Sequence, residues 1–370
     1  MEKGEHLFES QIPGKQLYVE IYSILQKVMG KKEFHNFQYI MDQDGMVYYG
    51  STYPRGTDDL EEYADRIKAL ETYVENNGAS FFFCMAPCKI TRGISQVNRS
   101  LLLNDPNIRM DTLLSKLQQR NVHSLDLRIP LMESGKPLSE LFYFADHYWT
   151  SKGALLGMIA LVDELNDYYG ENLDPTLYYR DLEQYDSKVY ENVVLGSDGK
   201  RIGLASCGLE DFVHLYPRNY EKSLYSWSCE DATLSRNGNL REALFLEEKL
   251  APTDFFTDTI YRVYLDQIHE KDTIINHNNP NGLKVAVLRD AYFSPMAVYL
   301  APMVGELDLY RNNSEAAAQK LLQSIEKKQY DYVIYETYPY NMEEENFPFF
   351  EDKIARNTVS KNTERGLHEK

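Results

Sequence analysis

The chain has 370 residues, 43% of them hydrophobic, and its 57 acidic against 39 basic residues give a formal net charge of −18. A chain of this length forms one large domain with an insertion, or two domains. Because this negative charge repels phosphate backbones and no basic stripe interrupts it, nucleic acid is excluded as a partner. The 29 tyrosines suit either ring-shaped polar ligands or a tyrosine-rich core.

The N-terminal part of the chain predicts a polar lead-in over residues 1–35, with an amphipathic helix over 17–29. Two short strands follow, over 36–41 and 46–49, joined by an acidic turn. We find no apolar run of membrane-spanning length and no signal-peptide core. Two alternatives remain: a cytosolic protein, or an exported protein whose export segment is not part of this chain.

Strand and helix patterns then alternate. Strands are predicted at 80–86, 122–127, 283–288, 306–310 and 331–335, and helices at 58–77, 110–119, 151–165, 294–302 and 314–327. The run 80–86 is continuously apolar, as in a strand buried on both faces of a parallel sheet. This alternation predicts an α/β domain with a parallel sheet and helices on both faces.

Residues 167–280 interrupt this alternation, because tyrosine, glycine, asparagine and aspartate crowd together there. We interpret this segment as an insertion or subdomain. The predicted organisation is a lead-in at 1–35, an α/β domain at 36–166 and 281–340, the insertion at 167–280, and a charged, partly disordered tail at 341–370.

The four cysteines lack the spacing of a metal site, and neither a metal nor a cofactor is expected. Cys207 and Cys229 lie in the irregular segment. They would form a disulfide in an oxidising compartment, or remain free thiols.

A polar and aromatic motif at residues 146–150 lies where an extended segment gives way to a helix. Asp146, His147 and Thr150 can accept or move protons, and Trp149 offers a flat face to a sugar ring. A cluster that opens a helix is placed to project into a cleft. The alternative is that Thr150 or Ser151 caps the helix while Trp149 fills the core.

A second segment, residues 289–292, follows a predicted strand and precedes a helix. Ligands of open α/β sheets bind at such carboxyl ends, where backbone amides and the helix dipole favour an oxyanion. The residue at the turn is Ala291, which has no nucleophilic atom. The nearest hydroxyls belong to Tyr292 and to Ser294, and we expect Ser294 to cap the helix that begins with Pro295.

In their order, these segments resemble the SGNH-hydrolase-like proteins related to alginate O-acetyltransferases, including the group named for its Asp-His-His-Trp motif. The resemblance covers residues 38–165 and 283–336. Three pieces of the sequence carry it, in this order along the chain. The first is residues 44–49 together with 86–89, the second is residues 146–150 together with 153–154, and the third is residues 289–292 together with 309–311. It implies a three-layer α/β/α SGNH-like fold with a mainly parallel sheet and an irregular insertion. It also implies an extracytoplasmic protein, membrane-anchored or secreted.

The chemistry that the resemblance implies is acetyl transfer to a polysaccharide hydroxyl by a serine nucleophile, a histidine base and an orienting aspartate. The aspartate corresponds to Asp146, but the histidine position is Tyr148 and the serine position is Ala291. His147 lies one place earlier, and adjacent side chains of an extended segment point in opposite directions. Three interpretations remain: an inactive relative that keeps a glycan cleft, an engineered serine-to-alanine exchange, or a rearranged site using His147 and another hydroxyl.

The polysaccharide or its acyl group is expected to contact four residues, Trp149, Arg289, Tyr292 and Arg311. The alternatives are a surface ion pair for Arg311 and a local salt bridge of Arg289 with Asp290. The expected function is cell-envelope polysaccharide O-acetylation with impaired catalysis. The competing hypotheses are a non-catalytic glycan-binding protein, a scaffold for a membrane-bound O-acyltransferase, and a cytosolic esterase.

Overall fold

The computed structural model describes residues 14–50, 56–95, 97, 105–230, 234–266 and 268–348. Within them, eight strands form the central sheet, in the order β5-β4-β13-β11-β12-β10-β8-β9. Their bounds are β4 Ser80–Met85, β5 Ser124–Asp126, β8 Tyr225–Cys229, β9 Ser235–Gly238, β10 Lys271–Asn276, β11 Lys284–Arg289, β12 Glu306–Arg311 and β13 Tyr332–Thr337.

The five strands from β5 to β12 in this order run parallel, and β10, β8 and β9 extend the sheet with antiparallel pairs. The predicted mainly parallel sheet is therefore confirmed. The segment 167–280, interpreted as an insertion or subdomain, contributes these three antiparallel strands to the same sheet.

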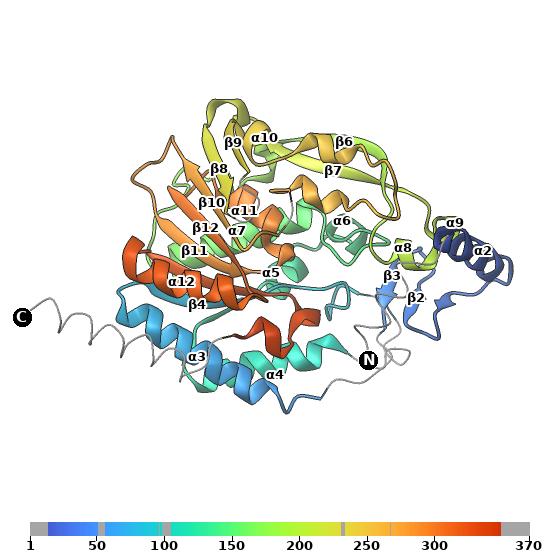
Figure 1. Ribbon diagram of the computed structural model, residues 1–370, viewed down its shortest axis with the longest axis horizontal. Coiled ribbons are helices and arrows are strands. Elements are labelled where there is room, and N and C mark those ends of the chain that lie inside the picture. Colours follow the sequence, from blue (N-terminus) through green and yellow to red (C-terminus); the bar gives the residue numbers. More distant parts are fainter. Residues whose placement is uncertain are drawn as a thin grey trace, which may run out of the picture.

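Helices cover both faces of the sheet, which gives the three layers visible in Figure 1. On one face lie α3 (Leu60–Asn76), α4 (Pro106–Gln119) and α12 (Glu315–Lys328), and on the other α7 (Ser151–Asp167) and α11 (Ser294–Leu300). Alternate residues of β4 explain its apolar run, because Phe81, Phe83 and Met85 enter one core while Phe82 and Cys84 enter the other.

Smaller elements surround these layers. The predicted N-terminal hairpin is confirmed as β2 (Tyr39–Met41) and β3 (Val47–Tyr49), and β1 (Glu33–Phe34) pairs with β2 to complete a separate sheet. A two-stranded sheet of β6 (Tyr185–Val194) and β7 (Glu210–Pro217) lies near the α7 face. The remaining helices are α2 Lys15–Val28, α5 Arg128–Glu133, α6 Leu138–Leu141, α8 Gly199–Ile202, α9 Leu204–Cys207 and α10 Leu240–Ala243.

All four cysteines carry free thiols in the structure, so Cys207 of α9 and Cys229 of β8 are not joined. The charged tail lies outside the described residues from position 349 onward. In the part of the chain that the structure describes, every helix is too short or too polar to cross a bilayer.

Candidate active site

The carboxyl ends of the parallel strands bring the predicted segments to one edge of the sheet. Ala291 follows β11, and Tyr338 follows β13. The motif at 146–150 reaches the same edge: the Tyr292 hydroxyl lies 3.5 Å from the carbonyl oxygen of His147, and the Tyr148 and Tyr292 rings are 5.7 Å apart. The two segments singled out in the sequence therefore meet, as expected for ligand sites of open α/β sheets.

Asp146 and His147 form the polar centre of this edge, and Ser197 joins them. The distance from His147 Nδ1 to Asp146 Oδ1 is 3.2 Å. Ser197 Oγ donates to Asp146 Oδ1 at 2.8 Å and lies 2.7 Å from His147 Nδ1, while the Ser197 N–H donates to Asp146 Oδ2 at 3.1 Å. Because the serine hydroxyl donates to the carboxylate, it accepts from His147 Nδ1–H, and Nε2 is the nitrogen left for acid–base work.

The charges of this pair stabilise each other. Burial tends to raise the pKa of Asp146, but the hydrogen bond and charge of His147 hold the pKa of the carboxyl at about 2. Burial tends to lower the pKa of His147, but its bond to Asp146 raises the pKa above the ordinary value. The pair therefore favours a carboxylate beside an imidazolium.

A buried lysine ties the N-terminal hairpin to the motif. Lys89 Nζ donates to the carbonyl oxygens of Val47 and Phe144, each at 2.8 Å, and the Val47 N–H donates to the same Phe144 oxygen at 2.8 Å. Asp198 Oδ2 lies 3.9 Å from Lys89 Nζ. Burial raises the pKa of Asp198 from 3.8 to about 6, although Lys89 and His147 lower it.

Asp198→Asn is expected to flatten the pH dependence of stability between about pH 4 and pH 6. The unfolded chain ionises this carboxyl near 3.8 while the folded protein keeps the proton until about 6, so the charged group costs stability as pH rises. At pH 7 the variant should recover up to about 3 kcal/mol of that cost. Urea unfolding at several pH values measures this. Asp186→Asn, at an exposed site, should leave the slope unchanged, and an unaltered slope in Asp198→Asn would contradict the assignment.

Hydrogen bonds to the Asp290 carboxylate hold the turn after β11. Its Oδ1 accepts from the Tyr292 N–H at 2.8 Å, and its Oδ2 accepts from the Tyr338 N–H at 2.9 Å and from Asn341 Nδ2 at 2.8 Å. These bonds hold Ala291 in a partly exposed position, with a methyl group where the resemblance places a serine.

Three of the four expected substrate contacts lie in the interior. Trp149, Arg289 and Tyr292 are at most 1% exposed. The indole Nε1 of Trp149 donates to the carbonyl oxygen of Tyr292 at 3.1 Å, and the Tyr292 ring stacks on Tyr338 at 4.6 Å. Trp149 thus fills the core, as the sequence alternative proposed. Arg311 is partly exposed and bonds to Asn313.

The side-chain contacts of Arg289 are neither the expected substrate contact nor the alternative salt bridge with Asp290. Its guanidinium donates to Asp272 Oδ2 of β10 at 2.6 Å, with both side chains 0% exposed. It also donates to Ser294 Oγ at 3.1 Å. Ser294 is therefore an acceptor within α11 rather than its cap, and the N-cap position is Phe293. The expected cap of α7 is confirmed: Thr150 Oγ1 accepts from the Gly153 N–H at 3.2 Å.

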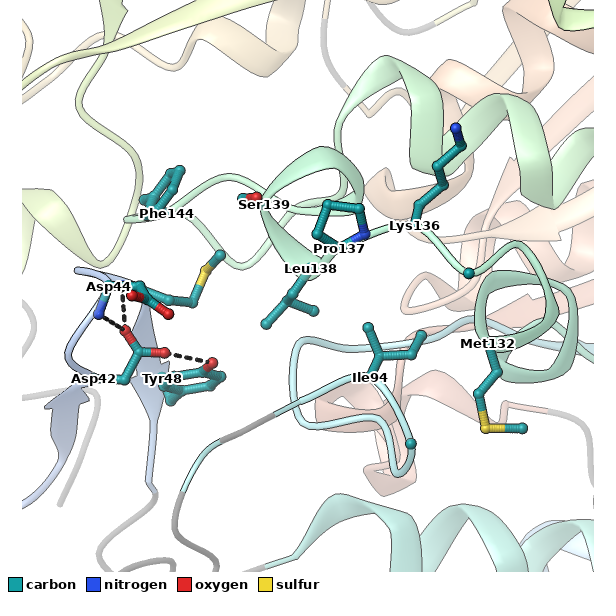
Figure 2. A pocket seen from close by; sticks show the side chains of 13 residues that line it. Asp42, Asp44, Tyr48, Ile94, Met132, Lys136, Pro137, Leu138, Ser139 and Phe144 are labelled. Atoms are coloured by element: carbon teal, nitrogen blue, oxygen red, sulfur yellow. Dashed lines mark hydrogen bonds between the residues drawn. The ribbon is translucent and has the colours of Figure 1, made fainter.

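A cavity of about 330 Å³ extends to Phe144, two residues before the motif, but its lining does not include residues 146–150 or Ala291 (Figure 2). Phe144 and Ser139 form part of its wall and also line a second cavity of about 570 Å³. In Figure 2, Leu138 points into the first cavity, while the Asp42 carboxylate accepts from the Tyr48 hydroxyl at 2.9 Å. Polar and apolar groups thus share the lining of both cavities, the mixture that a sugar ring requires.

Residues 45–184 match the family model of the SGNH hydrolase-like domain of acetyltransferase AlgX. The matched residues of this domain include the whole motif at 146–150 and end before Ala291. The family resemblance inferred from the sequence is confirmed.

Solved structures share the fold of the SGNH-like domain. Bacillus cereus PatB1 is 17% identical, with a TM-score of 0.66 over 84% of this chain and 99% of PatB1. A DHHW family protein from Eubacterium siraeum is 14% identical, with a TM-score of 0.57 over 84% of this chain and 93% of that chain. No curated protein matches the sequence. These similarities show the fold, and the function has to be argued from the site.

Proposed function

We propose that this protein acts in cell-envelope polysaccharide O-acetylation outside the cytoplasm, and that its own SGNH site is catalytically impaired. The supporting observation is the methyl group of Ala291, held at the turn after β11 where the family resemblance places a nucleophilic serine. A methyl group cannot form an acyl-enzyme. Asp146 is present at the aspartate position that the resemblance implies.

Tyr148 supports the same conclusion at the histidine position. Its ring stacks on Tyr261, with centroids 3.7 Å apart and planes 11° apart. Burial raises the pKa of the Tyr148 hydroxyl far above its ordinary value, with a further contribution from the Asp146 charge. A phenol in this state does not act as a base at neutral pH. An engineered exchange at position 291 alone would leave Tyr148 unexplained.

A rearranged site would have to use Ser197 as its nucleophile. In a serine–histidine–aspartate triad the serine and the aspartate contact opposite imidazole nitrogens. Here Ser197 Oγ and Asp146 Oδ1 both lie at His147 Nδ1, and the Ser197 hydroxyl donates to Asp146. The hydroxyl therefore links the carboxylate to the imidazole instead of giving its proton to a base.

The alternative function is a non-catalytic one, in which the protein binds the glycan or docks a membrane-bound O-acyltransferase. The cavity of about 570 Å³ favours binding, because Thr150 of the motif lines it and it needs no nucleophile to hold a sugar. Oligosaccharide binding without turnover would support a glycan-binding role. Binding only to a partner acyltransferase would support a scaffold.

Hydrolysis of 4-nitrophenyl acetate tests the impaired site. We expect the parent chain to remain at the uncatalysed rate, because it has no nucleophile at position 291 and no histidine at position 148. Ala291→Ser combined with Tyr148→His should raise the rate by at least about tenfold, a small part of the roughly million-fold effect of an intact triad. Ala291→Ser alone should give less, since its hydroxyl would have no base in place.

Ser197→Ala, made in the parent and in the double variant, is the matched control. It should change the hydrolysis rate little in either background, although Asp146 would lose the hydrogen bond from the Ser197 hydroxyl. Hydrolysis by the parent that is abolished by Ser197→Ala would overturn the impaired-site proposal in favour of the rearranged site. A folded double variant with no activity would contradict the assignment of positions 148 and 291.

A further inference from the structure

Helix α2 turns its apolar side outward. The buried residues of this helix are polar, Ser23 and Gln26. Its large apolar side chains recur at helical spacing along the opposite side and are between 45% and 80% exposed; they are Leu17, Tyr18, Ile21, Ile24, Leu25 and Val28. We call these six residues the α2 apolar face. A surface helix of a globular protein usually buries such a face in the core.

Polar contacts hold α2 in this orientation. The Glu20 carboxylate accepts from the backbone N–H groups of Leu204 and Ala205 at the start of α9. Ser23 Oγ lies 2.8 Å from Ser206 Oγ, and Lys27 Nζ donates to the carbonyl oxygen of Ala205 at 2.8 Å. Rotating the apolar face inward would break all of these contacts. The outward orientation is therefore built into the fold.

The position of α2 leaves this face accessible. Figure 1 shows α2 at the right-hand end of the molecule, with α9 beside it and α8 on the side of the main body. The whole helix is about 21 Å long. The described part of the chain thus offers an extended apolar strip at its periphery.

The charges around the strip contrast with the rest of the molecule. Residues 15–33 carry four lysines against two glutamates, within a chain of net charge −18. Glu20 faces α9, and Glu33 lies 3.7 Å from Lys31. Residues 15–33 therefore carry a positive net charge. An exposed apolar strip in such a segment, with a tyrosine on the strip itself, is complementary to the acyl boundary and anionic headgroups of a bilayer.

A second copy of the chain fits this face less well. A pair of such faces would need matching shapes along a strip that is one helix wide and about 21 Å long. Pairing two such helices would also bring two sets of lysines together. A lipid surface has neither restriction, because it needs no matching shape and carries the opposite charge.

We propose that α2 docks on an anionic lipid bilayer, with the α2 apolar face at the headgroup–acyl boundary and the positive net charge of residues 15–33 attracting the anionic headgroups. This proposal goes beyond the proposed function and does not depend on it. Docking through α2 would hold the SGNH-like domain at a membrane surface in one orientation.

Co-sedimentation of the full chain with vesicles tests this. We expect binding to vesicles that mix phosphatidylglycerol with phosphatidylcholine, and weak binding to phosphatidylcholine alone. Ile21→Ser/Ile24→Ser/Val28→Ser should weaken binding to the mixed vesicles at least tenfold. Raising the salt concentration should weaken binding of the parent, because salt screens the lysines.

The matched control places the same substitutions on equally exposed apolar residues elsewhere: Ile129→Ser/Val189→Ser/Leu224→Ser. This variant should bind as the parent does. Failure of the parent to bind mixed vesicles, or equal binding by both variants, would overturn the proposal. A dimer in sedimentation velocity that only the α2 variant dissociates would assign the face to a second copy instead.

Discussion

Arg289→Met is expected to lower the free energy of unfolding by about 3–5 kcal/mol, because it leaves a buried carboxylate without its counterion. Arg289 and Asp272 are both 0% exposed, and their 2.6 Å bond joins neighbouring regions of the sheet across β12. Methionine retains much of the volume but none of the five donors. Urea unfolding monitored by circular dichroism measures the loss.

Asp272→Asn in the Arg289→Met background is the control for this interpretation. Asparagine removes the unpaired charge and keeps an oxygen for Trp227, whose Nε1 donates to Asp272 Oδ1 at 3.0 Å. The double variant should therefore be more stable than Arg289→Met alone. If the double variant is as unstable as Arg289→Met or less stable, packing around the guanidinium matters more than the charge.

Gly196→Ala is expected to be the most damaging small substitution near the site. Gly196 has a φ of +77°, and a Cβ built on it would lie 2.1 Å from the carbonyl oxygen of Ala145 and 2.8 Å from the Asp146 nitrogen. Both neighbours are backbone, so the segment before the motif would have to move. We expect the free energy of unfolding to fall by about 3 kcal/mol or more, because overpacking adds to the strain of a left-handed backbone at an alanine.

Gly170→Ala separates these two contributions. Gly170 has a similar φ of +79°, but no atom lies within 4 Å of its added Cβ. Gly170→Ala should lower the free energy of unfolding by about 1 kcal/mol, from backbone strain alone. Thermal unfolding of both variants gives the comparison. Similar losses in the two variants would show that the close approach at Gly196 relaxes at little cost.

The parallel part of the fold was predictable because its strands carry a strong local signal. The run 80–86 is apolar at every position from Phe81 to Ala86, and a run of this length favours a strand buried on both faces. The antiparallel extension was not predicted. Its strand β8 does alternate, with Tyr225, Trp227 and Cys229 buried between two serines. The strand is short, and its partner β10 lies far along the chain, so no local pattern indicates the pairing.

The site was predicted only where its residues lie close in sequence. Asp146 and His147 stood out because they are adjacent and precede a capped helix. Ser197 lies 51 residues later, and only the tertiary fold brings it to them. The aromatic residues were placed wrongly for a related reason: Trp149 and Tyr292 have the surfaces that bind sugars, but the same surfaces pack against each other in the core.

The position of β13 in the sheet affects how the chain can fold during synthesis. β13 lies between β4 and β11, although it is the last described strand to leave the ribosome. Until residues 332–337 emerge, the apolar strand β4 has an unpaired edge where its central neighbour belongs. Such an edge invites pairing with other chains. The nascent chain therefore carries an unpaired edge of β4 from the synthesis of this strand until residue 337 has emerged.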